Sequence, residues 1–207
     1  MTSRLTQKTE MTSLMTKISH KKQILSIGVD VGTKNGALCV INEDLQILYA
    51  SKVPTYQTEI KSKRNKSKLN KETMKYEKEY KKRTWVDFKS LGRLLNPYKD
   101  NEIIYTVEKV LVKPGEGEPN SFVFGNAMGI FQGLYTLLNP IDYYEPLAVT
   151  WKKDLGVSSI KDTSVELCES IYNVKLRDIV SKGKVDDIAE ALLLAFYGLK
   201  QYYSKEQ

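Results

Sequence analysis

Apolar runs separated by short polar turns follow the polar N-terminal stretch of the chain. Residues 24–30 and 36–42 form two such runs, joined by a glycine-bracketed turn, and a third run covers 45–53 and ends before Pro54. Apolar runs of this length bounded by turn residues are typical of buried strands. Their short connections predict an antiparallel meander that starts a sheet.

The apolar spacing becomes helical near Trp85, where large apolar residues recur every three or four positions as far as Leu95. Asn96-Pro97 then forms a helix stop signal. Ser121 is a suitable N-cap for a later helix over 121–138. The same reasoning predicts further strands at 103–110 and 141–144, and further helices that open at 151–153 and cover 161–172 and 184–199.

These elements predict an α/β fold with a mixed five-stranded sheet flanked by helices. A length of 207 residues fits one domain, which we place at 24–207. Residues 58–83 are then an insertion after the third strand, and we expect it to be partly helical through 71–82. Residues 1–23 are rich in Ser, Thr and Lys and predict a flexible leader.

Positive charge is concentrated in this insertion. Between Lys61 and Arg83 there are eleven basic and three acidic residues, a balance of 11 − 3 = +8, whereas the whole chain carries +7. A concentrated positive field indicates a surface that binds a polyanion such as nucleic acid. A solvated loop without a partner is the alternative interpretation.

Cysteine and histidine are too scarce for several classes of chemistry. Cys39 and Cys168 lie far apart and outside any CxxC pair, so we expect buried, reduced thiols and neither a disulfide framework nor a zinc site. The one histidine, His20, lies in the leader, which removes most Ser-His-Asp, Cys-His and His-ligated metal sites. No run approaches about 18 apolar residues, so no membrane span is expected. Any chemistry must therefore use carboxylates.

Carboxylates occur where burial or mutual repulsion makes them unfavourable without a partner. Asp30 ends the first apolar run, and Glu108 lies near the end of a later one. Asp186, Asp187 and Glu190 open the last helix, where Glu190 shares a face with either aspartate, at i,i+4 or i,i+3. The helix dipole would explain the helical acids alone. It does not explain acids on buried strands, which are costly to desolvate.

A metal ion is the partner that this set of ligands favours. Oxygen ligands without histidine or cysteine suit a hard cation, Mg²⁺ or Mn²⁺. Two such ions about 3.5–4 Å apart can activate water and stabilise the leaving oxygen in phosphodiester hydrolysis. Basic residues nearby would hold a nucleic-acid backbone.

Three sequence blocks resemble those of RuvC-type Holliday junction resolvases of the RNase H-like superfamily, in its phage, viral and organellar branch. In order, they are IGVDVGTKNGALCVI, YTVEKV and KVDDIAEALLLAFYGLK. The intervening blocks PGEGEPNSFVFGNAMGIFQGL and VTWKKDLGV are also similar, so the resemblance covers about residues 24–200. It implies an RNase H-like fold and a homodimer that nicks opposing strands of a four-way DNA junction, with two Mg²⁺ or Mn²⁺ ions per site.

The resemblance also implies roles for the carboxylates. Asp30 would bridge both metal ions, and Glu108 would bind one of them. Bacterial members resemble D-x-x-D, which selects Asp187 with Glu190. Phage-like members resemble D-x-x-x-E, which selects Asp186 with Glu190. Glu190 is therefore an expected ligand in either case, and the choice between the two aspartates stays open.

Contacts with the nucleic acid are implied in the same way. Bacterial members carry an aromatic wedge three residues after the strand glutamate, where this chain has Leu111. Phe122 or Phe124 would replace it, unless both serve packing. The basic residues expected to contact DNA, unless they are ordinary surface residues, are Lys63, Arg64, Lys113, Lys152, Lys153 and Lys161. Lys152 is also placed to stabilise the scissile phosphate.

Other functions fit parts of the pattern. GVDVGTKNG also resembles the first phosphate loop of actin-like and sugar-kinase ATPases, but 207 residues cannot supply the two domains that clasp ATP, so no nucleotide cofactor is expected. It fits small RuvC-like nucleases of ribosomal RNA precursors too, although those are shorter and lack PGEGEPNSFVFGNAMG. Cleavage of another branched DNA or of a structured RNA, and non-catalytic binding of branched nucleic acid, remain alternatives. The expected location is the cytoplasm or another reducing compartment that holds DNA.

Overall fold

A mixed five-stranded sheet lies at the centre of the computed structural model, which describes residues 22–61, 67–69, 76–78, 80–111, 118–158, 163–180 and 185–205. The strand order is β3-β2-β1-β8-β9. The strands are β1 (Ile24–Asp30), β2 (Ala37–Asn42), β3 (Ile47–Lys52), β8 (Glu102–Val107) and β9 (Asp142–Tyr144). The first three pair antiparallel, whereas β8 pairs parallel with both β1 and β9. The predicted mixed sheet and its opening meander are confirmed.

Both faces of the sheet are buried because its central strands are apolar at nearly every position. All six residues of β2 are buried. Ala37, Cys39 and Ile41 belong to the core on one face, whereas Leu38 and Val40 belong to the core on the other, as the two-residue period of a strand requires. The ends of β1 and β8 are therefore held between two packed layers.

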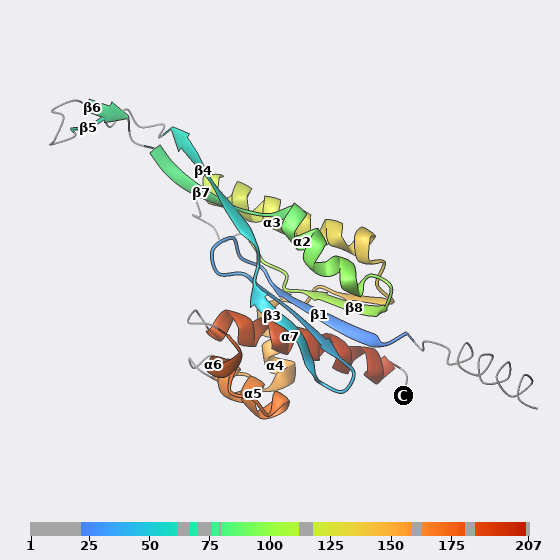
Figure 1. Cartoon of the computed structure of the whole chain (residues 1–207). Coiled ribbons are helices and arrows are strands. Elements are labelled where there is room, and N and C mark those ends of the chain that lie inside the picture. Colours follow the sequence, from blue (N-terminus) through green and yellow to red (C-terminus); the bar gives the residue numbers. More distant parts are fainter. Residues whose placement is uncertain are drawn as a thin grey trace, which may run out of the picture.

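Helices cover the two faces in separate groups (Figure 1). One face carries α7 (Val185–Lys205), together with α4 (Ala148–Leu155), α5 (Thr163–Tyr172) and α6 (Leu176–Ile179). The other face carries α2 (Phe88–Leu95), the short 3₁₀ helix η1 (Asn96–Tyr98) and α3 (Glu118–Leu138). The helix α7 packs directly on β1, β2 and β8, so it reaches the strands that carry Asp30 and Glu108.

A glycine lets α7 approach β1 closely. A Cβ atom at Gly28 would overlap the backbone of α7 at Ala191 O and Ala195 N. Across the same interface, Ser26 Oγ donates a hydrogen bond of 2.7 Å to Ala195 O. The position of α7 along the strand is fixed by these contacts.

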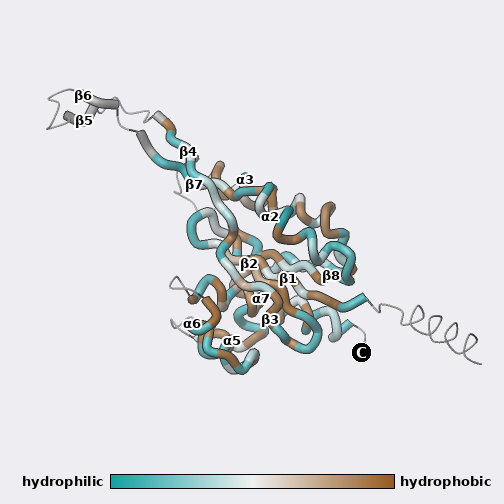
Figure 2. The backbone as a smooth tube through the Cα atoms, viewed as in Figure 1, coloured by the Kyte–Doolittle hydropathy of each residue, from teal (hydrophilic) through white to brown (hydrophobic). Residues whose placement is uncertain are grey.

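A two-stranded ribbon projects from the body at the predicted insertion (Figure 1). We call its strands β4 (Thr55–Lys61) and β7 (Tyr80–Val86) the arm; they pair antiparallel along their whole length. The short strands β5 (Ser67–Leu69) and β6 (Tyr76–Lys78) lie between β4 and β7 in the sequence and pair with each other. Figure 2 shows mainly hydrophilic residues along the arm, whereas hydrophobic segments gather in the body.

The predicted helix through 71–82 is wrong where the structure describes this segment, because 76–78 and 80–82 are strands. Lys and Glu favour helices in isolation. Pairing with β4 gives β7 its backbone hydrogen bonds, and this non-local pairing overrides the local preference.

Two predicted helix starts also need correction. Trp85 belongs to β7, and α2 begins at Phe88 after Asp87, whose carboxylate accepts a hydrogen bond of 3.1 Å from Ser90 N. The helix α3 begins at Glu118, so Ser121 lies inside it and is not its N-cap. The predicted stop at Asn96-Pro97 is confirmed, since α2 gives way to η1 there.

Both cysteines are buried and free, as predicted. Burial raises the pKa of each thiol, that of Cys168 to about 12, so neither is a reactive thiolate. Within the described ranges, no helix combines the length and apolar character needed to cross a bilayer. All of the predicted leader except its last two residues lies outside the described residues.

Candidate metal centre

Two carboxylates meet at one edge of the sheet because their strands run parallel. Asp30 is the last residue of β1, and Glu108 follows directly after β8. The two strands pair in register from Ile24 onward. At their carboxyl ends, Glu108 N donates a hydrogen bond of 2.9 Å to Val29 O. Strand pairing therefore places both side chains at the same edge of the sheet.

A third carboxylate comes from α7. Glu190 lies near the start of this helix, between Ala189 and Ala191, which are both fully buried against the sheet. One carboxylate oxygen from each of Asp30, Glu108 and Glu190 lies within 4.8 Å of the others. These groups come from three elements distant in sequence and form an acidic cluster with the ligand chemistry of a hard cation.

The electrostatics of the cluster favour a bound cation. Burial raises the pKa of Asp30 well above its usual value, and the nearby charges of Glu108, Glu190 and Asp187 raise it further, whereas Lys152 lowers it. Burial likewise raises the pKa of Glu108. A carboxylate in such a place ionises only at a cost. A divalent cation would remove that cost, so the residues present fit a metal ion.

Two adjacent residues of α4 hold two of the carboxylates. The fully buried Trp151 donates a hydrogen bond of 3.0 Å from Nε1 to Glu108 Oε2. Lys152 Nζ lies 2.7 Å from Glu190 Oε1, and both side chains are partly exposed. The ammonium group also lies 5.1 Å from the centroid of the Trp151 ring. Partners of this kind orient metal ligands and tune their basicity.

The two aspartates of α7 differ in their surroundings. Asp186 is exposed to solvent, whereas Asp187 is half-buried. The charge of Asp187 contributes to the raised pKa of Asp30. Burial and this effect on Asp30 distinguish Asp187 from Asp186, but the group of carboxylate oxygens within 4.8 Å of one another contains neither aspartate.

The residues predicted to contact nucleic acid are placed less uniformly. Phe122 is 64% exposed, and its ring meets that of Trp85 edge-on at a centroid distance of 6.0 Å. Phe124 is half-buried, and Lys153 is exposed on α4. Leu111, at the family's wedge position, is also exposed. The predicted contacts outside the described residues are Lys63, Arg64, Lys113 and Lys161.

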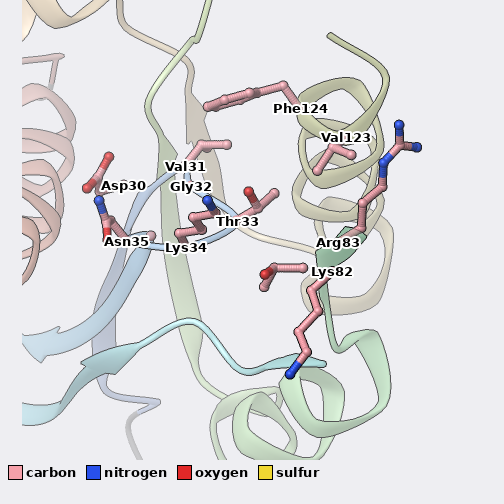
Figure 3. A pocket seen from close by; sticks show the side chains of 12 residues that line it. Asp30, Val31, Gly32, Thr33, Lys34, Asn35, Lys82, Arg83, Val123 and Phe124 are labelled. Carbon is pink, nitrogen blue, oxygen red and sulfur yellow. The ribbon is translucent and has the colours of Figure 1, made fainter. Parts of the chain in front are cut away.

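A cavity of about 520 Å³ adjoins Asp30 on the side facing the arm (Figure 3). One wall is the loop 31–36 between β1 and β2, and the others are β7 at residues 82–84 and α3 at Val123 and Phe124. In the sequence, Lys82 and Arg83 stand out only as part of a basic run. Their place at this cavity depends on the strand pairing of the arm, which local sequence does not reveal.

Comparison with known proteins supports the fold at the level of structure. The sequence matches no protein-family model and no curated protein. A structure of Thermus thermophilus RuvC in complex with Holliday junction substrate is similar, with a TM-score of 0.53 and 12% identity over 88% of this chain and 96% of that chain. A second T. thermophilus RuvC structure gives a TM-score of 0.49 at the same identity and coverage. The first of these likenesses shows that the chain has the predicted RNase H-like fold of RuvC.

Proposed function

We propose that this protein is a metal-dependent endonuclease that resolves four-way DNA junctions by paired symmetric nicks. The observation that carries the proposal is the convergence of Asp30, Glu108 and Glu190, with oxygens within 4.8 Å of one another, on a RuvC-like fold. Phosphodiester hydrolysis is a chemistry that such a half-buried carboxylate cluster can support when it binds Mg²⁺.

The ligands of the metal would be Asp30, Glu108, Glu190 and one aspartate of α7. Asp187 is favoured over Asp186 because it is half-buried and lies close enough to affect Asp30. Two Mg²⁺ or Mn²⁺ ions bound there would activate the attacking water and stabilise the leaving oxygen.

The chain's own side chains have separate tasks in this proposal. Trp151 holds Glu108 through its indole N–H. Lys152 pairs with Glu190 and remains partly exposed, so its ammonium group can also reach an oxygen of the scissile phosphate. Lys153 and the aromatic rings of Phe122 or Phe124 would contact the junction, as would the predicted basic residues outside the described ranges.

A homodimer would supply the two sites that paired nicks need. We place its surface on α3, whose exposed residues include Tyr135 and Leu137, at 47% and 51%. Large exposed apolar side chains favour contact with another protein surface.

The test is a cleavage assay on a synthetic four-way junction, a linear duplex of the same sequence and an RNA junction, each with Mg²⁺ or EDTA. Symmetric nicks on the DNA junction with Mg²⁺ alone would support resolution. Cleavage of the RNA junction alone would mean that the substrate is a structured RNA, and binding without any cleavage would point to a non-catalytic protein.

Asp30→Asn is the matching variant. We expect it to lower the cleavage rate by on the order of 10³-fold or more, because it removes the central ligand, while junction affinity measured in EDTA stays near that of the wild type. Cleavage at the wild-type rate would refute the assignment of the site.

A further inference from the structure

The cavity between Asp30 and the arm takes no part in the proposed chemistry. It begins at Asp30, passes the loop 31–36 and ends against β7. Its volume of about 520 Å³ falls within the range of about 300–1,000 Å³ typical of ligand sites. A ligand seated in it would lie directly beside the metal centre.

Positive charge dominates the described lining of this cavity. Three cations, Lys34, Lys82 and Arg83, line it, and Asp30 is the one carboxylate among the described lining residues. In Figure 3, Lys82 and Arg83 leave β7 in opposite directions, as successive residues of a strand do. Phe124 reaches over the loop from α3. Cations on two sides and an aromatic ring are the groups that bind a polynucleotide strand.

The walls of the cavity are fixed to one another. Val53 N donates a hydrogen bond of 2.8 Å to Gly36 O, which ties the loop to the chain entering the arm. On the arm itself, Trp85 Nε1 donates a hydrogen bond of 2.8 Å to Thr58 Oγ1, across the ribbon. The Trp85 ring also contacts Phe122 of α3. The loop, the arm and α3 therefore form a preformed site, and preformed sites lose less entropy on binding.

We infer that this cavity is a backbone-binding site for the DNA strand next to the scissile phosphate, with Lys82 and Arg83 of the arm binding its phosphates. The inference rests on the proposed function for the position of the cut. It assigns to the root of the arm a role in holding the cleaved strand, in addition to any general attraction by the charge of the insertion. Neither cation contacts the carboxylate cluster, so the role is in binding and not in the chemical step.

The experiment compares two double variants that remove the same charges. Lys82→Ala/Arg83→Ala removes two cations from the β7 wall of the cavity, whereas Lys89→Ala/Arg93→Ala removes a lysine and an arginine from exposed positions of α2, away from the cavity. Affinity for a labelled four-way junction is measured by fluorescence anisotropy in EDTA at several salt concentrations. Cleavage is measured with Mg²⁺ at saturating junction.

We expect the cavity variant to raise the Kd on the order of tenfold per lost contact at about 0.1 M salt, and to lower the slope of log Kd against log salt by about 1 per contact. At saturating junction, its cleavage rate should fall by a smaller factor than its affinity does. The α2 variant should leave both the slope and the cleavage rate unchanged. Equal effects of the two variants on Kd would overturn the inference, because general charge would then explain the binding.

A second measurement locates the contacts on the substrate. Single phosphates of the cleaved strand are replaced by neutral methylphosphonates, one position at a time. The wild type should lose affinity at one or two positions beside the cut, and the cavity variant should show no further loss there. If both proteins gave the same profile, the cations would contact the DNA elsewhere, which would contradict the inference. Displacement of the junction by millimolar ATP would indicate a mononucleotide site and would also contradict it.

These outcomes are separable from failure of the proposed function. If the wild type never cleaves but its binding depends on Lys82 and Arg83 as expected, the backbone-binding site is supported and the proposed nuclease function is refuted. If the wild type cleaves junctions but the two double variants bind them equally well, the nuclease function is supported and the backbone-binding site is refuted.

Discussion

The candidate metal centre and the arm lie side by side, but their residues are positioned in different ways. The carboxylates of the centre come from β1, β8 and α7, whose residues are packed in the two cores of the sheet. Among the strands that the structure describes, those of the arm pair only with each other, and Lys82 is exposed. The carboxylates are therefore held by packing, whereas the cations of the arm are held by one ribbon and by side chains at its root.

This difference follows from what each region has to do. Metal ligands must meet within a few tenths of an ångström, so they need rigid support from surrounding packing. A phosphate backbone is attracted by charge over several ångströms, so a solvated ribbon is sufficient. Changes in the core should therefore affect cleavage, and changes in the arm should affect binding.

The largest expected effect distinguishes the two aspartates of α7. Asp187→Asn should lower the cleavage rate by about 10- to 100-fold or more, because Asp187 is half-buried and lies near Asp30. Asp186→Asn is the matched control at an exposed position and should stay within about twofold of the wild type. Junction binding should be unchanged in both, as measured by anisotropy in EDTA. A greater loss for Asp186→Asn would mean that α7 is rotated relative to the arrangement described above.

A smaller effect is expected where α7 meets β1. Gly28→Ala would place a Cβ atom against Ala191 O and Ala195 N, so α7 must shift, at a cost of about 1–3 kcal/mol in the free energy of unfolding. Glu190 would move with the helix, and cleavage should fall even where the protein is folded. Urea unfolding and the cleavage rate together measure both effects.

The control for this change is Gly129→Ala on α3, where an added Cβ atom has no neighbour within 4 Å. Alanine is a better helix residue than glycine, so this variant should gain about 0.5–1 kcal/mol. If Gly28→Ala were as stable and active as the wild type, the close approach of α7 would not be what positions the carboxylates.

The smallest expected effect is a pH dependence of stability without metal. Burial raises the pKa of Asp30 in the folded state, so the folded chain holds this proton to a higher pH than the unfolded chain does. Stability of the metal-free protein should then fall as pH rises from the ordinary aspartate value of about 3.9 through the raised pKa. Asp30→Asn lacks this loss and should melt higher at neutral pH by at least about 2 °C.

Thermal unfolding in EDTA across a pH series measures this difference. It should vanish at acid pH, where Asp30 is protonated in both states, and Mg²⁺ should stabilise the wild type more than the variant. The difference in stability between Lys82→Ala, a variant of the arm, and the wild type should not depend on pH. A difference between Asp30→Asn and the wild type that is constant with pH would exclude the burial of charge as its cause.

The central sheet was predictable because its strands are short apolar runs with clear turn signals. The apolar runs that end at Asp30 and near Glu108 predicted both strands and identified both carboxylates. These carboxylates meet because neighbouring parallel strands end at the same edge of the sheet. The arm was not predictable in this way. Its Lys- and Glu-rich sequence favours a helix locally, and its strands form only because β4 and β7 pair across the insertion.

Some features of the site depend on packing that a sequence does not express. The choice between Asp186 and Asp187 depends on the rotation of α7 about its axis, which contacts such as Ser26 with Ala195 O determine. Trp151 was recognised only as the start of a helical region, and its hydrogen bond to Glu108 depends on where α4 lies. The location of Lys82 and Arg83 at the cavity depends on the register in which β4 and β7 pair.

The position of α7 has a consequence for the synthesis of the chain. The strands β1 and β2 leave the ribosome early, but the helix α7, which covers one of their faces, begins only at Val185, 185 − 30 = 155 residues beyond Asp30. At typical translation rates this interval is on the order of ten seconds, during which two apolar strands have one side uncovered. Apolar strand surface is therefore exposed during this interval, and Glu190 can join Asp30 and Glu108 only after most of the sequence has been translated.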